Sequence, residues 1–156
     1  MQTQLNQPIV RPAQPGDAPC LAPRLRKADI AELSALRGIE PGVALLEGYH
    51  VSTVCFSLTL EDKTLAMFGA APSADQVGCV WLLGSEEMLN QRSWFIRNSR
   101  PWLARLHQIY PTLFNYVDKR NTAHIRWLKW LGFSFKQLHP DFGVSSLPFY
   151  EFWRSR

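Results

Sequence analysis

LFNYVDKRNTAHIRWLKWLGF, residues 113–133, decides the fold of this chain, because a strand, a turn, a helix and a helix stop follow one another directly. Leu113 to Val117 is rich in aromatic and β-branched residues, which is typical of a strand covered on both faces. Asn121 occupies the position of a helix N-cap, and apolar residues then recur at helical spacing up to Gly132, which favours a left-handed helix end. The free N–H groups of such a helix point at the sheet edge, so the stretch predicts a site for a phosphate or thioester ligand.

Two segments of the chain resemble the GNAT acyltransferase superfamily. Asn121 through Gly132-Phe133 resembles its N-x-x-A-x-x-x-Y-x-x-x-G-F signature, with the spacing from Asn to Gly-Phe intact. Residues 9–13, IVRPA, followed by Asp17, are similar to the I-R-x-A-x-x-x-D start of that superfamily. A narrower likeness connects NYV, NTAHIRWLK and the segment Gly38–Pro41 with the GNAT-like internal virion protein of short-tailed bacteriophages.

Length and composition predict one compact domain. A chain of 156 residues can bury about 70% of its unfolded surface, which is enough for a core without disulfides. We expect a flexible N-terminus over residues 1–8 and a single GNAT-like domain over 9–156. The apolar runs predict a strand at 9–13, helices at 25–36 and from Pro41, strands at 54–60, 65–70 and 77–83, a helical region at 86–110, then strand, helix and two strands. This order, β-α-α-β-β-β-α-β-α-β-β, agrees with the mixed α/β sheet flanked by helices that the resemblance implies.

Charge and cysteine usage exclude several classes of function. The net charge of +4 permits contact with an anion, but basic residues occur throughout the chain, so we do not expect a nucleic-acid partner. The three cysteines, Cys20, Cys55 and Cys79, lie far apart and lack metal-ligand spacing, which predicts no metal site and a reducing compartment. No apolar run approaches the roughly 20 residues of a membrane span, so we expect no membrane partner and a cytoplasmic location.

The resemblance implies a cofactor site for acetyl-CoA between two splayed parallel strands. The strand at 77–83 would then place Trp81, Leu82 and Leu83 nearest the cofactor, unless it is an ordinary core strand. The family's glycine-bearing phosphate loop has no glycine here, and Glu86 and Glu87 stand in this region. Arg92 and the helix start at Ser93 are candidates to replace the loop, the alternative being a solvated basic helix face.

The catalytic tyrosine of the family is also replaced. The residue seven positions after Asn121 is Leu128, which lines the predicted cofactor site but cannot donate a proton. His124 lies four residues earlier on the same helical face, and a histidine there could protonate the leaving thiolate. The alternative is a histidine that is simply hydrogen-bonded or solvated. Tyr116, on the preceding strand, is a second and weaker candidate.

These features lead to two functional hypotheses. The first is a phage-encoded, acetyl-CoA-dependent N-acetyltransferase that acts on an amine of a host protein or metabolite in the host cytoplasm. The second is a non-catalytic GNAT-fold protein that binds a host protein or forms part of the virion interior. Trp127 and Trp130, together with Arg126 and Lys129, would suit such a binding face. The sequence does not determine the acceptor or the oligomeric state.

Overall fold

The computed structural model describes residues 6–156 of the chain. The flexible segment predicted for residues 1–8 therefore lies mostly outside the described residues. A seven-stranded sheet runs in the order β1-β2-β3-β4-β5-β7-β6. The elements in chain order are β1 (Ile9–Pro12), α1 (Asp17–Leu21), η1 (Ala22–Arg24), α2 (Lys27–Arg37), α3 (Pro41–Val51), β2 (Val54–Leu60), β3 (Lys63–Ala74), β4 (Val77–Gly84), η2 (Glu86–Gln91), α4 (Arg92–Ile109), β5 (Thr112–Asp118), α5 (Thr122–Trp130), β6 (Ser134–Phe142) and β7 (Leu147–Ser155).

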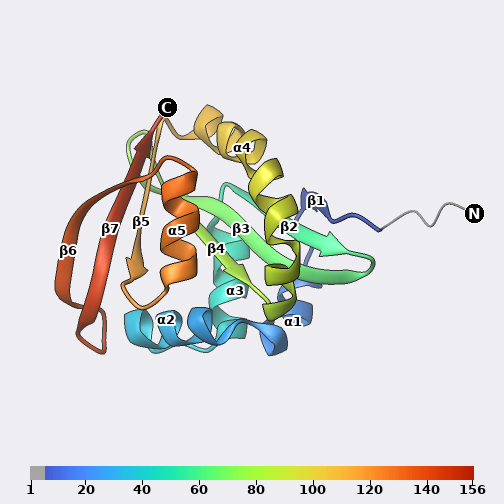
Figure 1. The fold of residues 1–156 in the computed structure, drawn as a ribbon, viewed down its shortest axis with the longest axis horizontal. Helices are drawn as coiled ribbons and strands as arrows, with labels where there is room; N and C mark the ends of the chain where they lie inside the picture. Colours follow the sequence, from blue (N-terminus) through green and yellow to red (C-terminus); the bar gives the residue numbers. More distant parts are fainter. Residues whose placement is uncertain (1–5) are drawn as a thin grey trace, which may run out of the picture.

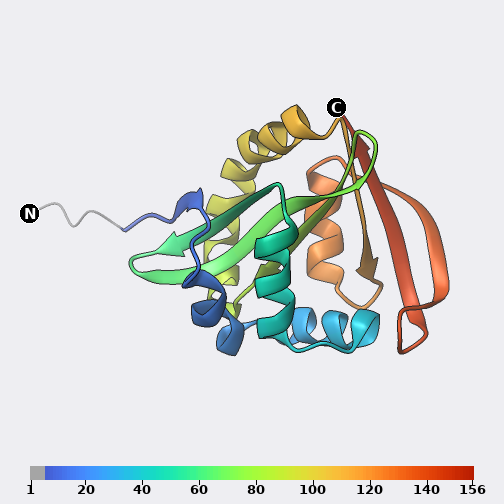
Figure 2. The same cartoon turned by 180° about the vertical axis from the view of Figure 1, so that it is seen from behind.

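Helices cover the sheet from both sides. Helices α4 and α5 lie in front of the strands in Figure 1, whereas α1 and α3 lie in front of them in Figure 2. The larger core cluster packs under α4 and α5 and includes Phe68, Phe95, Leu113 and Phe152. The smaller cluster packs under α1 and α3 around Leu21, Leu45 and Met67. This three-layer arrangement follows from strands whose two faces are both apolar.

The predicted mixed α/β sheet is confirmed, and the element order differs from the prediction at one point. Pro15-Gly16 forms a turn, and the short helix α1, which was not predicted, follows it directly. Pro101 lies inside α4 without dividing it into two helices, while residues 86–91 form the separate 3-10 helix η2. Gly38 and Gly132 end their helices with φ values of 65° and 89°, and the left-handed helix end at Gly132 is the one predicted from the sequence.

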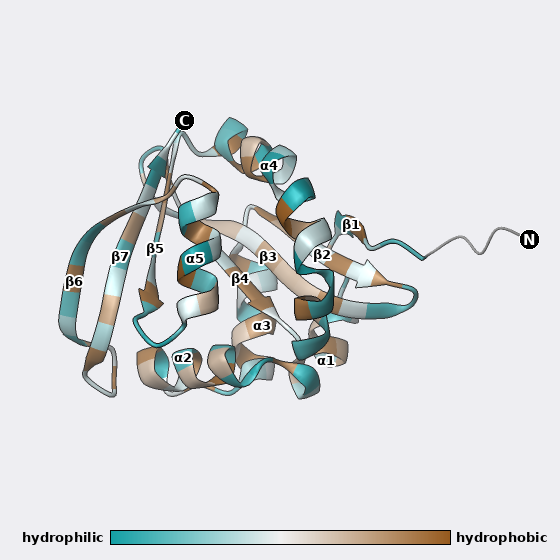
Figure 3. Cartoon of the chain, in the orientation of Figure 1, coloured by the Kyte–Doolittle hydropathy of each residue, from teal (hydrophilic) through white to brown (hydrophobic). Residues whose placement is uncertain are grey.

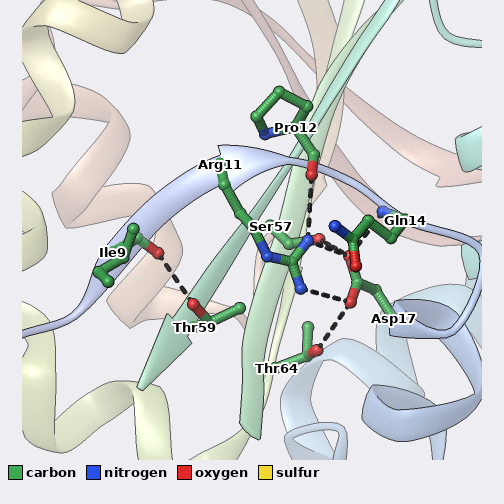
Figure 4. A network of polar contacts seen from close by, with 8 residues as sticks. All are labelled: Ile9, Arg11, Pro12, Gln14, Asp17, Ser57, Thr59 and Thr64. Carbon is green, nitrogen blue, oxygen red and sulfur yellow. Dashed lines mark hydrogen bonds and ion pairs between the residues drawn. The ribbon is translucent and has the colours of Figure 1, made fainter. Parts of the chain in front are cut away.

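Figure 4 shows a polar network that fixes the start of α1 against the sheet. Asp17 accepts two hydrogen bonds from Arg11, at 2.8 and 2.9 Å, and one each from the Gln14 N–H and the Ser57 hydroxyl. Burial by itself raises the pKa of Asp17, but these donors outweigh it and lower the pKa to about 2. The network joins β1, β2 and α1, and it explains why Asp17 follows the first strand so closely.

Candidate active site

The strands β4 and β5 are paired only at their beginnings. Their parallel pairing covers Val77 to Cys79 against Thr112 to Phe114 and then stops, although both strands continue. At the point of separation the Asn115 side-chain amide donates to the Val80 carbonyl at 2.7 Å, bridging the two strands. Beyond this bridge, no strand of residues 6–156 lies beside this edge of β4.

Leu82 is the residue of β4 whose backbone is free to bind a ligand at this edge. Backbone groups that face one neighbouring strand come from alternate residues. The Val80 carbonyl faces β5, and at Gly84 the N–H donates to Asp29 at 2.9 Å while the carbonyl accepts from the Arg26 N–H. The groups of Leu82, between these two, therefore face the open split.

A cavity of about 320 Å³ occupies the split. Its walls come from α2, α3, β4, β5, α4 and α5, and apolar side chains form most of its surface. The predicted site residues that line it are Trp81, Leu82, Leu83, Tyr116, His124 and Leu128. Six of the nine candidate residues therefore surround one cavity. Cofactors and other small-molecule ligands generally bind in a concave, largely apolar cavity of this kind.

The three neighbouring residues of β4 contribute in different ways. The Trp81 side chain packs on Gly48 of α3, and its indole N–H donates to the Ser52 hydroxyl at 2.8 Å. Leu83 also packs on the α1–α3 side, whereas Leu82 packs on the α4–α5 side. Since the backbones of Trp81 and Leu83 face β3, these two residues can line the cavity only with their side chains.

His124 lies in the wall of the cavity one helical turn before Leu128. Its Nδ1 is buried and has no hydrogen-bond partner among the described residues. Burial lowers the pKa of His124 to about 4, with nearby Arg26 adding to this effect and Asp29 opposing it. The imidazole is therefore neutral at pH 7, so it can donate a hydrogen bond but does not carry the imidazolium proton that a strong acid would offer.

Asn121 begins α5 at the predicted N-cap position, but the predicted capping role is wrong. Its side chain makes no capping hydrogen bond. Instead, Nδ2 donates to Glu32 of α2 at 2.8 Å, and Oδ1 is buried without a partner in the described part of the chain. Asn121 is absent from the cavity wall, so it ties the start of α5 to α2 and positions the carboxyl group of Glu32.

Glu32 is the cavity residue with the most perturbed acidity, and the sequence prediction missed it. Burial raises its pKa to about 8; the neighbouring carboxylates Asp29 and Asp118 add to this, and the Asn121 hydrogen bond opposes it. A carboxyl group poised near neutral pH in a cavity is a typical proton acceptor. Nothing around position 32 marks it in the sequence, because the hydrogen-bonding partner Asn121 lies 89 positions away and the burial comes from folding.

Tyr116 reaches the same cavity from β5. Its ring packs against Phe142 at 4.3 Å and His139 at 5.6 Å between ring centroids. Burial, Glu151 and Cys79 together raise the pKa of the Tyr116 hydroxyl. The phenol therefore keeps its proton at neutral pH and can act as a hydrogen-bond donor in the cavity.

Arg92 and Ser93 are exposed at the start of α4 and do not line the cavity. The acidic residues before them are turned to other partners. Glu86 accepts a hydrogen bond from the Lys27 N–H, and Glu87 pairs with Arg24 at 3.2 Å and with Lys63 at 3.8 Å. The start of α4 is thus left with unopposed basic charge, as an anionic ligand would require.

Among residues 6–156, no group of three or more His, Cys, Asp or Glu side chains is placed to hold a metal ion. Within the same residues, no helix is both long and apolar enough to cross a membrane.

The fold matches solved acetyltransferases of the GNAT type. Ard1 from Thermoplasma volcanium superposes with a TM-score of 0.76 at 15% identity, covering 95% of this chain and 97% of that chain. The ribosomal-protein-S18-alanine N-acetyltransferase from Escherichia coli gives 0.70 at 11% identity, covering 96% and 94%. An acetyltransferase from Bacillus subtilis in complex with CoA gives 0.66 at 10% identity, covering 96% and 98%. At these identities the likeness shows that the chain has the GNAT fold.

Sequence comparison gives a more specific assignment. No curated protein sequence is similar enough to this chain to count as a match. A family described as "Bacteriophage T7, probable scaffold protein Gp13" matches residues 55–140, which include β4, the split and α5. Because the match spans more than half of the chain, the chain belongs to this family, and it does so on a GNAT fold.

Proposed function

We propose that this protein transfers an acetyl group from acetyl-CoA to an amine. The observation that carries the proposal is the split between β4 and β5, with the free backbone of Leu82 at its edge and a largely apolar cavity inside it. An extended chain that contains amide groups, such as pantetheine, can pair with a free strand edge as an added strand does. The solved relatives from Bacillus subtilis and Salmonella typhimurium that contain CoA or acetyl-CoA share this fold, which supports the same ligand here.

The cavity residues fit the chemistry of amine acylation. Bound acetyl-CoA supplies an activated carbonyl and a thiolate leaving group. Glu32 accepts a proton from the acceptor ammonium at its carboxylate, since its pKa of about 8 lies closer to that of an amine than an ordinary carboxylate does. His124, neutral and with an unpartnered Nδ1, is placed to donate or accept one hydrogen bond in the cavity.

Charge at the cavity wall favours a cationic acceptor. Glu32 and Glu47 both line the cavity on the side of α2 and α3, and Glu47 is also paired with Arg37 at 3.0 Å. An amine on a host protein or metabolite would meet these carboxylates before it reaches the split. A phage protein acting in the host cytoplasm would encounter both kinds of acceptor.

The proposal is tested by selective labelling of leucine amides with ¹⁵N. Acetyl-CoA should shift the Leu82 resonance and leave the paired strand residues Leu58 and Leu113 nearly unchanged. Ligand at about 100 times its Kd should also add close to 2.7 kcal/mol to the free energy of unfolding. An unchanged Leu82 resonance and an unchanged Tm at millimolar acetyl-CoA would remove the enzymatic proposal.

Activity is measured by the release of free thiol in the presence of polyamines and lysine-containing peptides. Glu32→Gln should lower kcat by about 10²-fold or more while the Leu82 shift persists. The exposed Glu40→Gln is the matched control, because it removes one carboxylate from the same side of the molecule without touching the cavity.

A second candidate function is a non-catalytic role in the virion or on a host protein. Two observations favour it: the family is described as a scaffold protein, and the 3-10 helix Glu86–Gln91 carries no glycine where the superfamily has its phosphate loop. A folded protein that shifts neither Leu82 nor its Tm, and that releases no thiol with any amine, would favour this second role.

A further inference from the structure

Charge is divided very unequally along this chain. Residues 92–156 hold eleven of the seventeen Lys and Arg residues but only three of the thirteen Asp and Glu residues. Helices α4 and α5 contain no acidic residue at all. The excess of positive charge therefore belongs to α4, α5 and the last strands, and not to the chain as a whole.

Five of these cations gather where α5 ends and β6 begins, and we call them the basic surface: Arg100, Arg126, Lys129, Lys136 and Arg154. Four are exposed, and Arg154 is half-buried. The ends of α4, α5 and β7 lie close together near the C-terminus in Figures 1 and 2. In Figure 3 the end of α5 alternates between hydrophilic and hydrophobic turns, and much of the adjoining β6 is hydrophilic.

Aromatic rings and backbone carbonyls hold four of the five cations of the basic surface in place. The Arg100 guanidinium lies 4.5 Å from the Trp130 ring, Lys129 Nζ lies 5.6 Å from the Phe135 ring, and Lys136 Nζ lies 5.0 Å from the Trp153 ring. Arg154 donates to the Leu131 carbonyl at 3.0 Å. In the described part of the chain, none of the five lies within 4.0 Å of a carboxylate oxygen.

A hollow of about 350 Å³ opens within the basic surface. It is lined by Gly132, Ser134, Lys136, Trp153, Arg154 and Ser155. Two cations and two hydroxyl groups therefore line one concave site. The nearby Glu151 carboxylate is not part of the lining; it accepts from the Trp153 indole N–H and interacts with Lys136. Hydroxyl and cationic donors of this kind are the usual contacts to phosphate oxygens.

We propose that the basic surface binds the phosphodiester backbone of a nucleic acid. The spread of basic residues along the sequence predicted no nucleic-acid partner, but their positions on the folded surface are not evident from that spread. An acidic protein partner fits less well, because the only large apolar side chain exposed among these contacts is Trp130, at 40%. Protein interfaces usually have an apolar centre, whereas backbone contacts to nucleic acid are cationic and hydroxyl-rich.

This surface is separate from the candidate active site. Ser155 pairs with Thr112 at the beginning of β5, which is the end where β4 and β5 are still joined. The split and its cavity lie toward the other ends of these strands. Binding at the basic surface therefore needs no acetyl-CoA and leaves the cavity accessible.

The test is fluorescence anisotropy with a 20-base-pair DNA duplex, an RNA duplex of the same sequence, and a polyglutamate peptide of similar charge. Lys129→Gln/Lys136→Gln should weaken duplex binding tenfold or more at low salt, because two contacts to phosphate groups are lost. Each lost contact should also reduce the magnitude of the slope of log K against log salt by about 1. The matched control is Lys27→Gln/Lys63→Gln, which neutralises two exposed lysines in the acidic part of the chain.

Tighter binding of one of the two duplexes identifies DNA or RNA as the preferred nucleic acid. Absence of duplex binding at 50 mM salt, or an equal loss of affinity in both double variants, would overturn the proposal. The proposal would also be overturned if polyglutamate bound as tightly as the duplexes and lost its affinity in Lys129→Gln/Lys136→Gln. That result would indicate an acidic protein as the partner of this surface. Circular dichroism of each variant excludes unfolding as the cause of lost binding.

Discussion

Glu32→Gln should change how the stability of this protein depends on pH. The pKa of Glu32 is raised from 4.5 to about 8, so between these values the folded state holds a proton that the unfolded state releases. The folded state binds more protons throughout this range, and stability therefore falls as pH rises through it. A shift of this size corresponds to roughly 5 kcal/mol, which is an upper bound because Glu32 interacts with the neighbouring carboxylates Asp29 and Asp118.

Glutamine at position 32 keeps an oxygen that can accept from Asn121 Nδ2 and removes the ionisation. We expect wild type to be similar in stability to Glu32→Gln at pH 5 and less stable by up to about 5 kcal/mol at pH 9. The measurement is urea denaturation followed by tryptophan fluorescence at pH 5, 6, 7, 8 and 9. Glu40→Gln, an exposed carboxylate on the neighbouring segment, is the control and should differ from wild type by a constant amount.

The reasoning fails if the difference between wild type and Glu32→Gln does not grow with pH. That result would mean that Glu32 titrates as an ordinary carboxylate, and its role as a proton acceptor near neutral pH would fall with it.

Two further predictions concern stability. Asp17→Asn should lower the free energy of unfolding by about 2 kcal/mol at pH 7, because the fold holds the pKa of Asp17 at about 2. This contribution is lost as pH falls through 2. Urea titrations at pH 7 and pH 2 should therefore show a smaller difference between the variant and wild type at pH 2. Gly143→Ala should lower the free energy of unfolding by about 2 kcal/mol or more, because φ is 73° and a Cβ would lie 2.5 Å from the Ala35 carbonyl oxygen. The control is Gly16→Ala, where nothing lies within 4 Å of the added Cβ. Equal melting temperatures of the two variants would contradict this prediction.

Some features of the site required no tertiary information. The strand and helix over residues 113–130 follow from hydrophobic periodicity, and Gly132 ends the helix because its position favours a positive φ. Trp81, Leu82, His124 and Leu128 were placed near one another by the resemblance to the GNAT superfamily, and all four line the cavity. The uneven distribution of charge was also present in the sequence, and a count over residues 92–156 would have found it.

The sequence by itself thus determined the α/β class, the boundaries of β4 and α5, and the side of α5 that faces the core, because these depend on neighbours a few residues apart. Only the tertiary structure decided which backbone groups are free at the split, that Asn121 binds Glu32 instead of capping its helix, and that Lys136 and Arg154 share one hollow. These features depend on contacts between residues far apart in the chain. Acidity and ligand-binding geometry are set by that long-range burial, for which a local pattern carries no signal.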